Sequence, residues 1–313
     1  VKMHKIFIEI LLKLTWHNPF GSRVRYRLKK YNLKRTGWVI SLHSASEKNL
    51  LNTEFWKKET HVSWHNSFDD SAIMGCADPF LIKDLNNIYL FYEVEIGTPV
   101  KGVLWCSKLE GNTFGKPTKI LEKEYHLSFP NVFLGENGEY LMIPESYENN
   151  TVDLYFAKKF PSNWEFDTTL FKGGAFVDTV FHVIDGVYYW FTYDLNVNRT
   201  RLFYSKSLRG SWTEHPNSFF NSNRNAGRIF FHEGKVIRPI QVSYESYGEG
   251  VQLMEITELS LTVFKEKLFK YRFLFKNKGF ELHGIHHFTF IENNEDVLIV
   301  TDGLNINFYK SIE

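Results

Sequence analysis

The chain has 313 residues, of which 37 are basic and 36 acidic, so its formal net charge is +1. This balance gives no electrostatic case for a nucleic-acid partner. Aromatic residues make up 17% of the chain, which favours β-strands and surfaces that stack on sugars. A chain of this length can bury a large core without disulfide staples. Its two cysteines, Cys76 and Cys106, are therefore predicted to be buried thiols in a reducing compartment.

Residues 1–36 are predicted to form an amphipathic and basic extension. The apolar residues Ile6, Ile10, Leu11 and Leu14 fall on one helical face, and a cluster of arginines and lysines follows. The apolar run is too short to span a bilayer, and it lacks the apolar segment and cleavage site of a signal peptide. Two interpretations stay open: the helix lies on an anionic membrane surface, or it packs on the following domain.

Five similar segments follow in chain order, each predicted to form a strand, a polar turn and a returning strand. "DPFLIKDLNNIYLFYE" is the first, and the segments begin at Asp78, Pro130, Asp178, Ala226 and His287. Three of the predicted turns contain Asn-Gly, Asp-Gly or Glu-Gly, and the others contain Asn86-Asn87 and Asn293-Asn294. Such residues suit hairpin turns because they tolerate positive φ. The spacings of 52, 48, 48 and 61 residues are typical of propeller blades.

Residues 37–313 are therefore predicted to form one all-β domain, a five-bladed β-propeller. A third strand follows most of the hairpins, for example "GVLWCSKL" and "TRLFYSKSL", and an outer segment follows three of these strands. Four-stranded blades are expected from this pattern. Residues 37–74 are expected to supply the outermost strand that closes the ring.

The predicted hairpins bring polar residues to one rim of the propeller. The start of each inner strand and the end of the next strand lie side by side, because an antiparallel hairpin returns to its origin. Acidic and amide side chains occupy several of these positions, namely Asp78, Glu93, Glu145, Asp178, Gln241 and Asp302. Nearby in the sequence are other polar residues, His126, Ser128, Arg228, Arg238, His283 and His286. Carboxylates that converge on one rim indicate a site, and the alternative is a set of caps and turns at strand ends.

This constellation suits chemistry at a glycosidic bond, which needs a pair of carboxylates. Asp78, Asp178 and Glu145 are the candidate catalytic residues. Glu93, His126, Ser128, Gln241 and His283 are candidate substrate-binding residues, and Arg228 and Arg238 are expected to hold a donor phosphate. No metal ion is predicted, because the histidines near Asp302 lack the spacing of a zinc site. No cofactor is predicted either, since the sequence has no phosphate-binding glycine-rich loop.

The motifs "ADPFLI", "HLSFPNVF", "FVDTVFHVIDGVYYWFT" and "AGRIF" resemble the propeller domain at the N-terminus of plant glucosamine inositolphosphorylceramide transferases. The resemblance covers residues 75 to about 303, and it extends to bacterial stand-alone relatives that are associated with surface-polysaccharide genes. The fold of this family is similar to that of glycoside hydrolase family 43. There the "ADP" motif carries the catalytic base, so the resemblance implies this role for Asp78. The second segment has "SFP" and the third "VDT" in place of the hydrolase motifs, which argues against simple hydrolysis.

Together, the residues and the resemblance favour a sugar transferase of bacterial surface-polysaccharide biosynthesis. Its expected partners are a glycan or nucleotide sugar and a membrane or lipid-linked acceptor. The expected location is the cytoplasm, at the periphery of the inner membrane. Two alternatives remain open, a glycoside hydrolase similar to family 43 and a propeller that binds glycans without catalysis.

Overall fold

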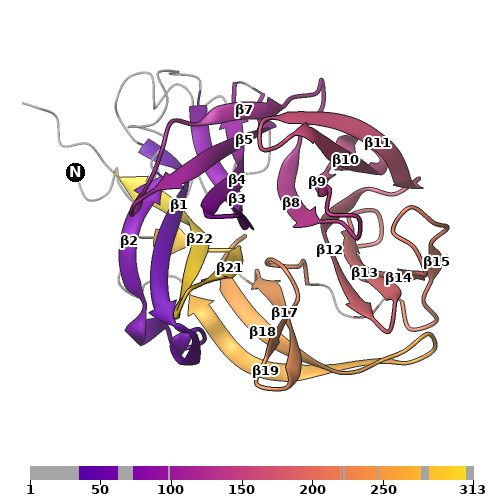
Figure 1. Ribbon diagram of the computed structural model, residues 1–313. Helices are drawn as coiled ribbons and strands as arrows, with labels where there is room; N and C mark the ends of the chain where they lie inside the picture. The colour runs from indigo at the N-terminus through magenta and orange to yellow at the C-terminus, as the bar shows by residue number, and fades with distance from the viewer. Residues whose placement is uncertain are drawn as a thin grey trace, which may run out of the picture.

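The computed structural model describes residues 35–62, 73–97, 99–218, 220, 223–244, 247–275 and 282–307. Five small antiparallel sheets surround a central axis (Figure 1), which confirms the predicted five-bladed β-propeller. The predicted N-terminal extension lies outside the described residues, except that Arg35 and Thr36 already belong to the first strand.

Each blade runs from an inner strand at the axis to an outer strand at the periphery. Blade 1 contains β3 (Ile73–Asp84), β4 (Asn87–Ile96), β5 (Lys101–Glu110), β6 (Thr113–Phe114) and β7 (Thr118–Leu121). Blade 2 contains β8 (Ser128–Leu134), β9 (Tyr140–Glu145), β10 (Thr151–Lys159) and β11 (Asn163–Lys172). Blade 3 contains β12 (Phe176–Ile184), β13 (Val187–Asp194), β14 (Arg199–Ser205) and β15 (Thr213–Glu214). Blade 4 contains β16 (Phe230–His232), β17 (Lys235–Val242), β18 (Gly250–Leu259) and β19 (Phe264–Phe275).

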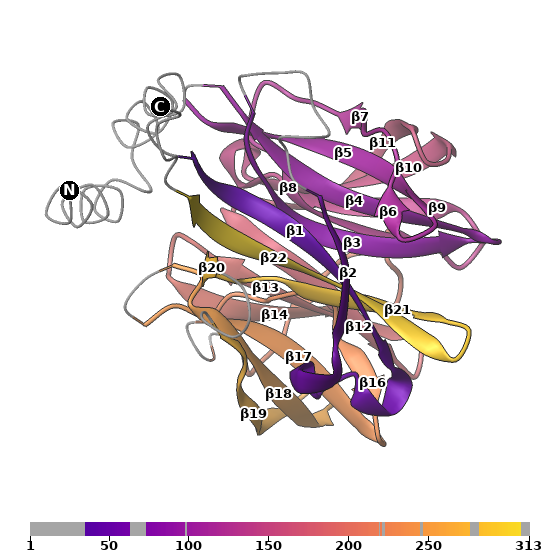
Figure 2. The same cartoon turned by 90° about the vertical axis from the view of Figure 1, so that its left-hand side faces the viewer.

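Blade 5 joins the two ends of the described chain and closes the ring. Its strands are β20 (Leu282–Gly284), β21 (Phe288–Asn293), β22 (Asp296–Asn307), β1 (Arg35–Ser46) and β2 (Lys57–Val62). β1 pairs with β22 along its whole length, and the two strands lie side by side in Figure 2. The N-terminal segment therefore supplies two strands of the closing blade, where the sequence predicted one. Short 3-10 helices follow β1 and β9, at Glu47–Asn49, Thr53–Phe55 and Tyr147–Asn149.

The hairpin turns lie close to their predicted places, with two shifts of one residue. Asp185 and Gly186 have positive φ, as do Glu233 and Gly234, which matches the prediction. In blade 1 the turn is Leu85–Asn86 rather than Asn86–Asn87, because Asn87 already begins β4. In blade 5 the turn begins at Asn294, because Asn293 still pairs with Asp296.

The hydrophobic core lies in layers between neighbouring blades. One cluster unites rings from blades 1 to 4, including Phe80, Phe129, Tyr155 and Phe191. Other clusters fill the interfaces of blade 5 with its two neighbours and of blade 2 with blade 3. Aromatic rings stabilise such clusters, because the edge of one ring packs favourably against the face of another. Cys76 and Cys106 are both buried and unpaired in this packing, as the sequence predicted.

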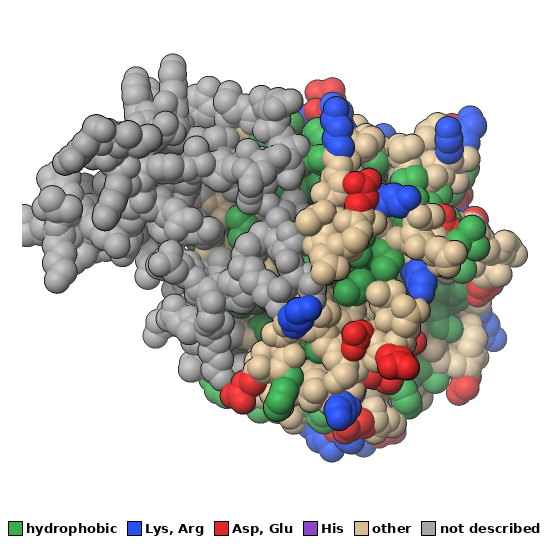
Figure 3. All heavy atoms as spheres, turned by 60° about the vertical axis from the view of Figure 1, so that its left-hand side comes forward, with side chains coloured by type: hydrophobic (Ala, Val, Ile, Leu, Met, Phe, Trp, Pro, Cys, Tyr) green, Lys and Arg blue, Asp and Glu red, His purple; other side chains and the backbone are tan. Residues whose placement is uncertain are grey.

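The surface of the described residues shows charges of both signs. On the face in Figure 3, acidic and basic side chains are interspersed among apolar and neutral groups. Among the described residues, no helix combines the length and the apolar character needed to cross a bilayer.

Candidate active site at one end of the inner strands

Three blades begin their inner strand with the same backbone irregularity. The pairing register shifts between Ala77 and Phe80 in β3 and near the start of β8 and β12. At each shift one residue has a positive φ, 52° at Asp78, 46° at Phe129 and 50° at Asp178. A bulge of this kind re-aims a side chain at the end of a strand. The residue of blade 2 that is equivalent to the two aspartates is therefore Phe129, and the predicted start at Pro130 was one residue late.

The second strand of each hairpin returns to the same end, as the sequence predicted. Glu93 pairs with Ala77, and Glu145 pairs with Ser128. Asp302, near the middle of β22, accepts hydrogen bonds from the residues that precede β21. These second-strand residues therefore face the bulged inner strands.

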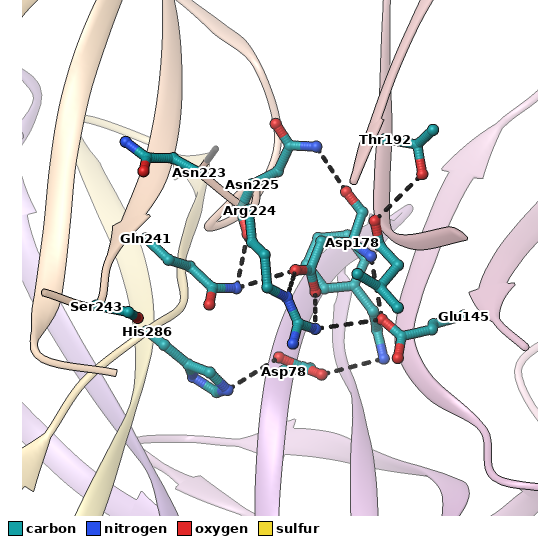
Figure 4. A network of polar contacts seen from close by, with 12 residues as sticks. Asp78, Glu145, Asp178, Thr192, Asn223, Arg224, Asn225, Gln241, Ser243 and His286 are labelled. Carbon is teal, nitrogen blue, oxygen red and sulfur yellow. Dashed lines mark hydrogen bonds and ion pairs between the residues drawn. The ribbon is translucent and has the colours of Figure 1, made fainter. Parts of the chain in front are cut away.

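Asp178 is a densely bonded carboxylate at this end (Figure 4). Its side chain accepts hydrogen bonds from Nε and Nη2 of Arg224, the latter at 3.1 Å, and from Nε2 of Gln241 at 3.1 Å. Asn225 donates to the Asp178 carbonyl at 2.7 Å. Only 1% of Asp178 is exposed. Charge-assisted hydrogen bonds of this number fix the position of a carboxylate, so Asp178 is suited to positioning its neighbours.

Glu145 lies beside Asp178 but has fewer partners. Its Oε2 accepts the backbone N–H of Asp178 at 3.0 Å and lies 3.6 Å from Nη2 of Arg224. Burial and the neighbouring Asp178 charge raise the pKa of Glu145 to about 7, although Arg224 and His126 oppose the shift. A carboxyl group with a pKa near neutrality can both donate and accept a proton at physiological pH. Glu145 therefore has the properties of a general acid or base.

Asp78 forms the other half of the site. Its Oδ2 accepts the backbone N–H of Phe129 at 3.2 Å, and its Oδ1 lies 3.8 Å from Nε2 of His286 and 3.6 Å from Nδ1 of His287. Burial raises the pKa of Asp78 well above its usual value, against the attraction of His286. Glu93 and the other nearby carboxylates add to this rise. Asp78 is thus held in place without the dense bonding of Asp178.

Asp302 anchors the histidine that faces Asp78. Its two oxygens accept the backbone N–H groups of His286, His287 and Asp78 at 3.0, 2.9 and 3.3 Å. Oδ2 also lies 2.5 Å from Nδ1 of His286. The His286 ring stacks on Trp38, with 4.2 Å between ring centroids, and meets the edge of Tyr247. The imidazole therefore packs against two aromatic rings and contacts Asp302 at one nitrogen.

Glu93 and His126 form a second pair beside Asp78. Nε2 of His126 lies 3.1 Å from Oε1 of Glu93, and Gly102 donates its N–H to Nδ1 of His126 at 3.0 Å. This donation places the ring proton on Nε2, facing the carboxylate. A Cβ on Gly102 would lie 2.2 Å from the Leu127 carbonyl oxygen and 2.5 Å from Glu93 Oε1. Glycine is therefore required for this close approach.

Two predicted phosphate-binding residues have other roles in the structure. Arg238 is fully buried, and its guanidinium binds Glu266 through three hydrogen bonds and Asn225 through one. Arg228 donates to the carbonyl oxygens of Leu81 and Val132. Protein acceptors engage both guanidinium groups, and the binding of a donor phosphate by Arg228 and Arg238 stays a prediction.

The other predicted substrate-binding residues lie in several places. Gln241 belongs to the Asp178 network, and Ser128 is buried opposite Glu145. The backbone of His283 lies in β20, but its side chain is outside the described residues.

Neither Arg224 nor Tyr247 was predicted from the sequence to belong to the site. The segment "SNRNAGR" contains Arg224 four residues before Arg228, and without the strand register either arginine is an equal candidate. The Arg224 guanidinium lies 5.6 Å from the centre of the Tyr247 ring. His286 was noted in the sequence, but nothing there separated it from His283 and His287.

Asp78, His286 and Asp302 place ligand atoms within 4.8 Å of one another, a spacing that a metal ion could use. The oxygens of Asp302, however, already accept three backbone N–H groups and contact the His286 ring. A metal ion would compete with these contacts. We therefore treat the three residues as a hydrogen-bonded network.

A family model described as the N-terminal region of glucosamine inositolphosphorylceramide transferase 1 matches residues 62–301. The chain belongs to this family. The Arabidopsis thaliana glucosamine inositolphosphorylceramide transferase 1 is 30% identical over 245 residues, which are 72% of this chain and 32% of that protein. The matched region thus spans about a third of this plant relative. The resemblance noted in the sequence is confirmed.

Solved structures share the fold at low sequence identity. A β-1,3-galactosidase of glycoside hydrolase family 43, solved with galactodeoxynojirimycin, gives a TM-score of 0.53 at 13% identity, over 69% of this chain and 83% of that chain. An exo-β-1,3-galactanase from Clostridium thermocellum gives 0.54 at 17% identity, over 67% of this chain and 52% of that chain. These likenesses confirm the propeller architecture predicted from the sequence.

Proposed function

We propose that the protein is a sugar transferase whose acid–base chemistry is carried out by Asp78 and Glu145. The observation that carries the proposal is the burial and the raised pKa of these two carboxyl groups. Both are buried at the same end of neighbouring blades, and burial raises the pKa of each. Perturbed carboxyl groups cluster at catalytic sites, because proton transfer requires a pKa near the working pH.

In the proposed reaction, Asp78 accepts the proton of an acceptor hydroxyl as its oxygen attacks the anomeric carbon of the donor sugar. Glu145, protonated up to about pH 7, donates a proton to the oxygen of the departing group. Asp178 holds Arg224 beside Glu145. The family supports transfer over hydrolysis, since its plant relatives are named transferases.

The proposed substrate is a sugar rich in hydroxyl and amino groups. Acidic side chains outnumber the arginine and histidines near the site, namely Asp78, Glu93, Glu145, Asp178 and Asp302 against Arg224, His126 and His286. Carboxylates bind hydroxyl groups and ammonium groups as acceptors. The names of the plant relatives contain an amino sugar, glucosamine, together with an inositol phosphate and a ceramide.

A nucleotide sugar donor and a lipid-linked acceptor of a bacterial surface glycan complete the proposal. The basic residues within 1–36 support a peripheral position at the cytoplasmic face of a membrane, since they favour anionic lipid. The ceramide in the names of the relatives is consistent with an acceptor at a membrane.

The test is a transfer assay with a panel of nucleotide sugars and with glucosamine, myo-inositol and a lipid-linked glycan as acceptors. Wild type, Glu145→Gln and the control Glu165→Gln are compared by mass spectrometry of the products. Glu165 is a suitable control because it lies on the surface in a pair with Lys158. We expect transfer by wild type and by the control, and a loss of about 100-fold or more in Glu145→Gln. Release of free sugar alone would indicate a hydrolase, and binding without turnover would indicate a glycan-binding propeller.

A further inference from the structure

We propose that Oδ1 of Asp78 and Nε2 of His286 form a two-point binding site for one hydroxyl group of the sugar acceptor, and that Asp302 positions His286 for this task. The inference rests on the function proposed above and adds the residues that hold the attacking oxygen.

One oxygen atom can bridge the two atoms from the side. Nε2 of His286 and Oδ1 of Asp78 are 3.8 Å apart (Figure 4), too far for a direct hydrogen bond. An oxygen atom at about 2.8 Å from each atom lies beside the line that joins them, where it accepts from the imidazole and donates to the carboxylate. Asp78 keeps 9% of its side chain exposed and His286 keeps 5%, so neither side chain is fully closed off from solvent.

The imidazole is fixed in the orientation that this contact requires. Nδ1 of His286 faces Asp302 at 2.5 Å, which leaves Nε2 directed toward Asp78. Trp38 covers one face of the ring and Tyr247 meets it edge-on. Asp302 is fully buried and is itself held by three backbone N–H groups. A carboxylate behind a histidine is a common device that sets its tautomer and orientation.

The charges around His286 favour its protonated form. Asp302 on β22, Asp78 on β3 and Asp178 on β12 face the ring, and together they outweigh burial and raise its pKa to about 9. Tyr247 contacts the ring through its edge. The adjacent His287 behaves differently, because burial lowers its pKa to about 3 and keeps it neutral. His286 can therefore donate from Nε2 at neutral pH while Nδ1 remains bonded to Asp302.

In the bound state, the acceptor O–H donates to Asp78 and accepts from His286. As the oxygen attacks, its proton passes to Asp78, and the O–H bond is replaced by a bond to the anomeric carbon. The bond from that carbon to the departing group breaks, and Glu145 supplies the proton for the departing oxygen. His286 keeps its proton and orients the oxygen, so it is a contact residue for the substrate. Asp302 acts only through His286.

The first test is a titration of the full chain by NMR with isotope-labelled histidine. We expect His286 in the wild type to lose its proton near pH 9, and Asp302→Asn to lower that midpoint by about one to three units. Because Asp302 also binds backbone N–H groups, the folding of this variant is checked by the dispersion of its spectrum. His232, which ends β16 in blade 4, serves as the internal control, and its signals should not be changed by the substitution. A wild-type midpoint near the ordinary histidine value of about 6.5 would overturn the inference.

The second test uses glucosamine and myo-inositol as probes. Both should shift the His286 signals of the wild type, and neither should shift them in Asp78→Ala. In the transfer assay, His286→Gln should raise KM for the acceptor and reduce kcat by about tenfold or more, while the affinity for the donor stays the same. If transfer by His286→Gln has the kinetics of wild type, the inference fails and the proposed function stands. If His286 responds to the probes but no transfer occurs, the hydroxyl site stands and the proposed function fails.

Discussion

Asp78 and Asp178 occupy the same backbone position in two blades, yet their surroundings give them different chemistry. Both lie at a bulge near the start of an inner strand, with φ of 52° and 50°. Arg224 and Gln241 surround the Asp178 carboxylate with hydrogen bonds. Asp78 accepts one backbone N–H and faces His286 across a gap. The blade repeat fixes where the carboxylate lies, and the contacts from neighbouring blades decide whether it anchors the site or reacts.

The largest expected effect is on catalysis at Asp78. Asp78→Asn should reduce the transfer rate by about 1000-fold, because general base catalysis contributes about 10² to 10⁴ in rate. Its melting temperature should change little, because Asp78 accepts one backbone N–H, that of Phe129, which the amide oxygen of asparagine can also accept. Steady-state kinetics and calorimetry measure the two effects. A variant that retains transfer but melts early would reverse the roles assigned to the two aspartates.

Asp178→Asn should have the opposite profile, with its main effect on stability. The substitution leaves the partly buried Arg224 without its principal counter-charge, although Glu145 lies 3.6 Å away. Breaking a buried pair from one side costs about 3 kcal/mol or more in the free energy of unfolding. Urea denaturation followed by tryptophan fluorescence measures this loss. The double variant Asp178→Asn, Arg224→Gln removes the unpaired charge and should recover part of the lost free energy of unfolding. A double variant no more stable than the single one would show that the unpaired arginine is not the cause of the loss.

Glu145 should make stability depend on pH. Its pKa is about 7 in the folded protein, above the usual value of 4.5, so the folded state binds its proton more tightly than the unfolded state. The resulting stabilisation is complete below about pH 4.5 and is lost as the pH rises through about 7. The difference of about 2.5 pKa units corresponds to roughly 3 kcal/mol in the free energy of unfolding.

The measurement is denaturation of wild type and Glu145→Gln between pH 4.5 and 8. The wild type should lose stability relative to the variant as the pH rises, and the variant should lack this contribution. Parallel curves for the two proteins would show that Glu145 titrates normally.

Arg238→Met should have the smallest effect of the four, about 2 kcal/mol in the free energy of unfolding. Arg238 supports Asp178 indirectly, through Asn225, and its main partner Glu266 keeps 9% of its side chain exposed. Because Glu266 remains partly solvated, the loss in the free energy of unfolding should be smaller than for a fully buried pair. Thermal denaturation of wild type and Arg238→Met, each with and without a nucleotide sugar, measures the loss of stability. The stabilisation by the ligand should be the same in both proteins. Loss of that stabilisation would support Arg238 as a phosphate-binding residue.

The local pattern of the sequence was sufficient for the fold. Repeated strand–turn–strand segments, Gly-containing turns and a spacing near 50 residues predicted five blades, and the structure has them. The same pattern predicted that Glu93 and Glu145 return to the end where Asp78 lies, because hairpin geometry is local. The errors of one residue at Leu85 and Phe129 arose because positive φ fell on residues that rarely adopt it. The error at Asn294 arose because two adjacent asparagines suit a turn equally well.

The chain by itself thus determined the blades, their rim and the carboxylates on it, since these follow from period, turn chemistry and pairing within one hairpin. Only the tertiary structure decided which cation meets which carboxylate. Arg224, Arg228 and Arg238 look alike in the sequence, but the first binds Asp178, the second binds carbonyl groups and the third binds Glu266. The contacts of Arg224 and Arg228 cross from one blade to another. The contact of Arg238 with Glu266 lies within blade 4, and it depends on the irregular pairing of β18 with β19. Burial, which sets the pKa of each group, also arises only when the blades pack together.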